Sequence, residues 1–103
     1  MNPDFFRQLQ EMQRRAAELQ EKLAGMEIEG SSGGGMVRVV LNGLGEMKGI
    51  SIDPTLMHSD QNRILEDLVV AACNDGKAKL ETRRAQDAQF FSDVLKGLGL
   101  PGS

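Results

Sequence analysis

The chain has 103 residues, four of them phenylalanine and none tryptophan or tyrosine, and its formal net charge is −3. This length corresponds to one domain with a small aliphatic core, and a domain of this size often relies on a partner to bury enough apolar surface. The acidic balance argues against nucleic-acid binding driven by bulk charge, so only a local basic patch could bind a polyanion.

The first expected element is a helix from Asn2 to about Gly25. Pro3 and Asp4 suit its N-terminus, because proline is tolerated in the first turn and an acid favours the positive end of the helix dipole. Apolar side chains recur along it at alternating spacings of four and three residues, which is a heptad seam. The seam consists of Phe5, Leu9, Met12, Ala16, Leu19, Leu23 and Met26. It predicts that this helix lies along another helix, supplied by its own chain or by a second copy.

A basic stripe runs beside the seam and consists of Arg7, Arg14, Arg15 and Lys22. Glu11 and Arg15, like Glu18 and Lys22, have the i,i+4 spacing of ion pairs that support an exposed helix. Taken alone, the stripe therefore favours a solvated helix face over a binding surface.

Three short strands are expected next, because apolar and polar residues alternate in three segments. The segments are Met26–Glu29, Val37–Asn42 and Gly49–Asp53. This alternation is typical of a sheet with one face in the core. A sheet of three short strands has two open edges and an uncovered face, so we expect the chain to oligomerise.

The connections between these strands carry their own signals. The glycine-rich run Gly30–Gly35 predicts a loose, flexible first turn. Asn42 and Gly43 predict a type I′ hairpin turn with positive φ. Pro54 ends the third strand, because proline lacks the backbone donor that a strand needs.

A long helix is expected from about Asp60 to Gly97, with Ser59 or Asp60 as its cap. Apolar side chains at helical spacing form a face that should cover the sheet: Ile64, Leu65, Leu68, Val69, Ala72 and Cys73. Gly76 either lies at a close contact within a continuous helix or marks a turn between two helices, and we favour one long helix.

The second half of this helix carries the densest positive patch in the chain. Its basic residues are Lys77, Lys79, Arg83 and Arg84, with only Glu81 among them to neutralise their charge. A solvated face and a binding surface are equally supported here. Phe90, Phe91, Val94 and Leu95 then form an apolar end that would pack on the first helix or on a partner. The glycine- and proline-containing segment 98–103 is expected to be a flexible tail.

Residues for catalysis or metal binding are not assembled in any recognisable pattern. One histidine, His58, and one cysteine, Cys73, do not make a metal site, and the glycine-rich turn lacks the Lys-Ser/Thr of a phosphate-binding loop. We therefore expect no enzymatic activity, no cofactor and no small-molecule ligand. A single cysteine forms no intramolecular disulfide, and neither a signal peptide nor a membrane-spanning run is recognisable, so we expect a cytoplasmic protein without a membrane partner.

Three segments, Met36–Gly43, Ile50–Leu56 and Leu65–Asp75, occur in the order helix, hairpin, strand, helix. Their most specific part is the Ile-Asp-Pro sequence followed by the Leu-Glu-Asp-Leu run and Ala-Ala-x-Asn-Asp. From the first helix to about Arg84, this combination resembles the YbaB/EbfC family of bacterial nucleoid-associated proteins. Gly76 and the Phe90-Phe91 end depart from the usual family pattern.

The resemblance implies one α+β domain over residues 1–97, with an N-terminal helix, a three-stranded antiparallel meander and a long C-terminal helix. It further implies a homodimer with a tweezer-like assembly, in which paired helical arms grip double-stranded DNA in the nucleoid and alter its conformation. Roles in nucleoid organisation and gene regulation follow from the same resemblance. By position, the implied DNA contacts are Arg7, Arg14, Arg15, Lys22, Lys77, Lys79, Arg83 and Arg84.

A second hypothesis belongs to a different class. The heptad helix and the Phe90-Phe91 end could dock partner helices, with the basic rows serving only solubility. Exposure of the two phenylalanines would favour such a protein-interaction module.

Overall fold

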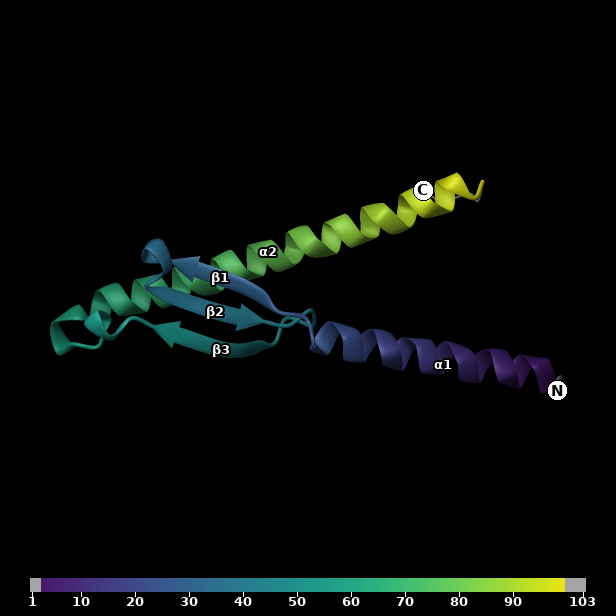
Figure 1. Cartoon of the computed structure of the whole chain (residues 1–103), viewed down its shortest axis with the longest axis horizontal. Coiled ribbons are helices and arrows are strands. Elements are labelled where there is room, and N and C mark those ends of the chain that lie inside the picture. The colour runs from purple at the N-terminus through teal and green to yellow at the C-terminus, as the bar shows by residue number, and fades with distance from the viewer. Residues whose placement is uncertain (1–2, 100–103) are drawn as a thin grey trace.

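A computed structural model describes residues 3–99, and it has the predicted α+β architecture (Figure 1). The helices are α1 (Pro3–Ala24) and α2 (Asn62–Gly97), and the strands are β1 (Ile28–Ser32), β2 (Val37–Leu41) and β3 (Met47–Ile52). The molecule is elongated, measuring 68 × 28 × 14 Å along its principal axes. Its length comes from α1 and the second half of α2, which leave the sheet at the same end and diverge (Figure 1).

The sheet is an antiparallel meander in the order β1-β2-β3. The helix α2 packs against β1 and β2, and the inward side chains of β2 form the centre of the core. Val37, Val39 and Leu41 have no exposed surface, as the alternating pattern predicted. Leu56 and Ala72 complete this buried cluster.

The third strand is less buried than its pattern predicted. Ile50 is the direct partner of the buried Val39, so the two side chains lie on the same face of the sheet. Ile50 is nevertheless 52% exposed, because α2 packs on β1 and β2 and leaves β3 at an uncovered edge. The strand ends at Ile52, before Pro54, as expected, and Pro54 begins a single-turn 3-10 helix that was not predicted.

The predicted flexible turn over Gly30–Gly35 is wrong for its first half. Gly30 and the two serines after it belong to β1, and only Gly33–Gly35 form the turn. A Cβ atom at Gly30 would lie 2.4 Å from the carbonyl oxygen of Ala72 and from the nitrogen of Gly76. The strand therefore contains glycine because the backbone of α2 packs directly on it.

The predicted type I′ turn is also wrong. The positive φ lies at Gly45 (87°), whereas Asn42 and Gly43 are not in the left-handed region. The backbone N–H of Gly45 donates to the carbonyl of Asn42, and the N–H of Asn42 donates to the carbonyl of Glu46. This is the pattern of a three-residue hairpin loop with its glycine in the last position.

The second helix is continuous through Gly76, as favoured from the sequence. Gly76 is buried at a close contact, because a Cβ atom there would lie 2.5 Å from Cδ1 of Leu41. The expected cap at Ser59 or Asp60 is wrong: these residues form a 3-10 turn over Ser59–Gln61, and α2 begins at Asn62. Of the expected tail 98–103, residues 100–103 lie outside the described residues.

The heptad seam of α1 finds no helix of its own chain to lie along. This helix contains no buried residue, and Met12 and Leu19 are 65% and 57% exposed. Of the seam residues, only Leu23 and Met26, at the end next to the sheet, are partly buried. The seam predicted a partner helix from the same chain or from a second copy. Residues 3–99 of the same chain do not supply this helix.

Candidate nucleic-acid interface

Two helical segments project beyond the sheet, and we call them the arms: α1 and residues 77–97 of α2. The last buried residue of α2 is Leu80, so most of the second arm is exposed on all sides. All eight basic residues expected to contact DNA lie on the arms, and each is exposed. The structure therefore places the two predicted basic groups on neighbouring helices at the same end of the molecule (Figure 1).

On the first arm, two of the four cations are already engaged by carboxylates. Arg14 pairs with Glu11 and, at 2.7 Å, with Glu18, and Arg15 reaches Glu11 at 3.3 Å. The hydrogen bond from Arg14 is the main cause that lowers the pKa of Glu11, and the same contact raises the pKa of Arg14. The expected Glu11–Arg15 pair is confirmed, whereas the expected Glu18–Lys22 pair is wrong because Glu18 binds Arg14.

On the second arm, two carboxylates outside the basic patch also form ion pairs with it. More of its positive charge is therefore neutralised than the single acid within the patch, Glu81, predicted. Lys79 pairs with Asp75 at 3.0 Å, and Arg83 pairs with Asp87 at 3.4 Å. Both pairs have i,i+4 spacing, from which the sequence alone predicts ion pairs. Exposed pairs of this kind contribute only about 0–1 kcal/mol and are screened by salt, so a competing phosphate can replace the carboxylate.

Three of the eight predicted cations form no ion pair with any residue of the described range 3–99: Arg7, Lys22 and Lys77. Arg84 differs from the other seven, because it is the one whose side chain reaches another element of the fold. Its guanidinium contacts Glu81 at 3.1 Å and donates to the carbonyl of Gly43, in the turn between β2 and β3, at 3.3 Å.

A cleft of about 510 Å³ lies between the two arms. Lys22 of α1 and Arg83 of α2 both line it, so the structure brings one predicted cation of each arm to the same place. Apolar side chains form most of the remaining wall: Leu19, Leu23, Met26, Phe90 and Phe91. Arg7, Arg14 and Arg15 lie further out along α1.

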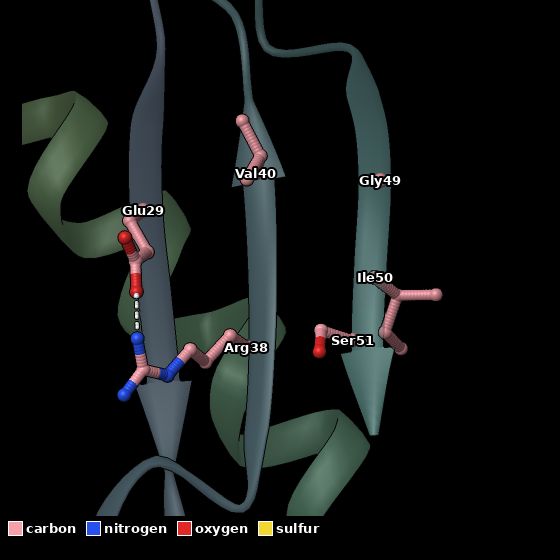
Figure 2. Close-up of a pocket in the computed structure, with 6 residues that line it drawn as sticks. All are labelled: Glu29, Arg38, Val40, Gly49, Ile50 and Ser51. Carbon is pink, nitrogen blue, oxygen red and sulfur yellow. Dashed lines mark ion pairs between the residues drawn. The ribbon is translucent and has the colours of Figure 1, made fainter. Parts of the chain in front are cut away.

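A second depression, of about 340 Å³, lies on the open face of the sheet and involves residues that were not predicted to be functional. Figure 2 shows Glu29 on β1 and Arg38 on β2 pointing toward each other, and their ion pair measures 3.6 Å. Val40, Gly49 and Ser51 lie beside them on the same face. Alternation placed these residues on one face of the sheet, but no motif distinguished them.

Two searches of residues 3–99 complete the description of the site. No cluster of three or more histidine, cysteine or carboxylate side chains in that range could hold a metal ion. Within the same range, no helix is both long enough and apolar enough to cross a membrane.

These features define a small α+β protein in which most basic residues lie on two projecting helices, and its sequence is similar to those of known proteins. Residues 1–94 match the model of the YbaB/EbfC DNA-binding family. A nucleoid-associated protein of Agrobacterium fabrum is 48% identical over 93 residues, which cover 90% of this chain and 84% of the relative. A nucleoid-associated protein of Brucella melitensis is 45% identical over 97 residues, covering 94% and 88%.

A solved structure agrees with these sequence matches. The crystal structure of an uncharacterized protein from Helicobacter pylori superposes with a TM-score of 0.67 and 30% sequence identity, covering 88% of this chain and 97% of that one. The chain belongs to the YbaB/EbfC DNA-binding family, as its sequence segments predicted.

Proposed function

We propose that this chain is a nucleoid-associated protein that binds double-stranded DNA as a homodimer and alters the conformation of the duplex. Residues 1–97 would act as one DNA-binding domain, with roles in nucleoid organisation and gene regulation. The observation that carries the proposal is the placement of all eight predicted cations, exposed, on two arms that leave the sheet at the same end. Family membership and the names of the relatives support DNA as the partner.

The chemistry of the arms suits the DNA backbone better than the bases. Lysine and arginine bind phosphates through charge and thereby release counterions, and such contacts carry no direct sequence information. The net charge of −3 is compatible with this, because charge acts locally. Arg7, Lys22 and Lys77 are free to bind phosphates at once, whereas Arg14, Lys79 and Arg83 would exchange carboxylates for phosphates.

A homodimer would solve two problems of the single chain. It would double a set of cations that is small in one protomer, because linking two sites raises the effective concentration of the second. It would also cover apolar surface that one chain leaves open, namely the seam of α1 and the open face of the sheet around Val40 (Figure 2).

The test is duplex-DNA binding at several salt concentrations, with sedimentation to determine the oligomeric state. For wild-type protein we expect a dimer whose log affinity falls linearly with log salt, with a slope of roughly −0.9 for each phosphate contact. The double variant Arg7→Glu/Lys77→Glu reverses one cation on each arm and breaks no ion pair among residues 3–99. It should lose affinity and show a shallower slope, while remaining a dimer.

The matched control is Lys48→Glu/Arg63→Glu, which changes the net charge equally at exposed positions away from the arms. If the control weakens binding as much as the arm variant does, bulk charge rather than the arms is responsible. A wild-type dimer that ignores DNA even at low salt would refute the proposed function.

One observation favours the second candidate function, a module that docks partner helices. Phe90 and Phe91 are 72% and 64% exposed, which is the condition under which the sequence favoured it. Apolar docking would respond little to salt. The variant Phe90→Ala/Phe91→Ala should then abolish capture of the partner, whereas it should leave phosphate binding by the arms largely intact.

A further inference from the structure

The turn between β2 and β3 touches both arms through a single buried residue, Gly43. Its N–H donates to the carbonyl of Leu23, in the last turns of α1, at 2.7 Å. Its own carbonyl accepts from Nη2 of Arg84, on α2, at 3.3 Å. Gly43 is therefore hydrogen-bonded to both arms, to α1 through Leu23 and to α2 through Arg84.

The packing around this residue is as close as its hydrogen bonds imply. A Cβ atom at Gly43 would lie 2.9 Å from the carbonyl oxygen of Leu23 and 3.0 Å from Sδ of Met26, so the turn meets α1 without room for a side chain. On the other side of the turn, a Cβ atom at Gly45 would lie 3.6 Å from Leu80 and 3.7 Å from Arg84. The turn thus fills the space between the bases of the arms.

Hydrogen bonds within the turn also restrict its own conformation. Asn42 is fully buried, and its side-chain oxygen accepts from the N–H groups of Leu44 and Glu46, both at 3.0 Å. Its amide nitrogen donates to the carboxylate of Glu46 at 2.7 Å. A turn with these hydrogen bonds has few conformations available. An arm that is hydrogen-bonded to this turn is therefore restricted in its position.

We propose that Arg84 and Gly43 form a brace that sets the separation of the two arms, and that Arg84 is a positioning residue rather than a phosphate contact. The guanidinium is suited to this role because its planar fork spans Glu81 on its own helix and the Gly43 carbonyl on the turn. The inference rests on the proposed function only for its consequence, namely that correctly spaced arms bind DNA more tightly.

The experiment measures the arm separation directly and without DNA. Spin labels at Gln13→Cys on α1 and Gln86→Cys on α2, in a Cys73→Ala background, report the distance between the arms by pulsed electron paramagnetic resonance. Labelled chain is diluted with unlabelled full-length chain so that distances within one protomer dominate. Arg84→Ala is compared with Lys77→Ala, which removes the same charge from the same helix but no contact with another element.

We expect Arg84→Ala to broaden or shift the distance distribution and Lys77→Ala to leave it unchanged. Gly43→Ala provides a second test that alters no charge, because its Cβ would push against the end of α1; we expect it to shift the distribution and to weaken DNA binding severalfold. Circular dichroism of each variant verifies that the fold is retained.

An unchanged distribution in both Arg84→Ala and Gly43→Ala would overturn the brace, whatever the effect on DNA. A fall in the salt slope of about 0.9 per lost contact in Arg84→Ala, with unchanged distances, would make Arg84 a phosphate contact instead. Because the distances are measured without DNA, a wild-type protein that fails to bind DNA would refute the proposed function and still leave the brace to be judged by its own result.

Discussion

Asn42 is a buried polar residue whose side-chain hydrogen bonds are all made within the turn between β2 and β3. Replacing it with alanine would remove the acceptor of the N–H groups of Leu44 and Glu46, and each intramolecular hydrogen bond contributes about 0.5–1.5 kcal/mol. We expect Asn42→Ala to lower the free energy of unfolding by about 2 kcal/mol, as measured by urea denaturation. Asn74→Ala, at an exposed helical position, is the control and should stay near wild type.

Gly30 illustrates a residue whose importance lies in the absence of a side chain. Gly30→Ala would place Cβ against backbone atoms of Ala72 and Gly76, which cannot rotate away. We expect a loss of about 3 kcal/mol or more, because overpacking of this kind typically costs about 1–3 kcal/mol even where side chains can yield. Thermal unfolding gives the measurement.

Gly49→Ala is the matched control for that substitution, since it also lies in a strand but has no heavy atom within 4 Å of the added Cβ. It should be neutral or slightly stabilising, because alanine loses less backbone entropy on folding than glycine does. Equal losses at the two positions would contradict the role assigned to the close contact between β1 and α2.

Among the elements, β1 and α2 are joined by a charged hydrogen bond as well as by packing. Oδ2 of Asp75 accepts from the N–H of Ser31 at 2.9 Å and lies 3.0 Å from Nζ of Lys79. The N–H of Ser31, followed by Lys79, lowers the pKa of Asp75. A carboxyl with a lower pKa in the folded state stabilises the fold above its unfolded pKa, about 3.9, and loses this contribution as pH falls through its folded pKa.

The resulting prediction concerns acid unfolding. Wild type should lose more stability than Asp75→Asn as pH falls from about 5 to about 3, because only wild type has this carboxylate to protonate. Urea denaturation across that pH range measures the difference. The control is Asp67→Asn on the same helix, where no hydrogen bond or ion pair with residues 3–99 is lost; a pH dependence equal to that of Asp75→Asn would contradict the assignment.

The strands and their connections differ in how well sequence patterns predicted them. Alternation identified the buried side of β2 correctly, because that strand is covered by a helix along its length. It missed Gly30 as a strand residue, since glycine has low strand propensity and the close approach of α2 is a tertiary effect. Asn42-Gly43 indicated a hairpin but not its type, which depends on the hydrogen bonds to Leu44 and Glu46.

The candidate site was predictable in part for a related reason. Helical spacing placed the eight predicted cations in rows on the two helices, where each is exposed, and the ion pair of Asp75 with Lys79 could have been derived from spacing alone. The contact of Arg84 with Gly43 could not, because it joins residues 41 positions apart through a turn whose conformation was mispredicted. Long-range contacts of this kind depend on how the elements pack.

For the whole molecule, the open face of the sheet gives a test of the proposed assembly. Val40 lies on that face beside Glu29 and Arg38 (Figure 2), and a glutamate there would put a charge into the surface proposed to meet the second copy. We expect Val40→Glu to shift the protein from dimer to monomer in sedimentation and to weaken DNA binding, since a single protomer presents half the cations.

Val70→Glu makes the same change at an exposed valine of α2 and should remain a dimer. If the control dissociates and Val40→Glu does not, the two copies meet through α2 instead of through the open face. If neither dissociates, the face around Val40 is not part of the assembly.

The exposure of the first arm, α1, has a consequence for the hydrogen exchange of its backbone amides. An isolated helix of 12–15 residues is marginal in water, and α1, with 22 residues and no buried one, gains little from tertiary packing. Its amide protons should therefore exchange with solvent much faster than those of β2, whose side chains form the core. Protection of the α1 amides from exchange therefore reports which residues of the seam are covered. This protection should rise when a second copy or a duplex orders the helix.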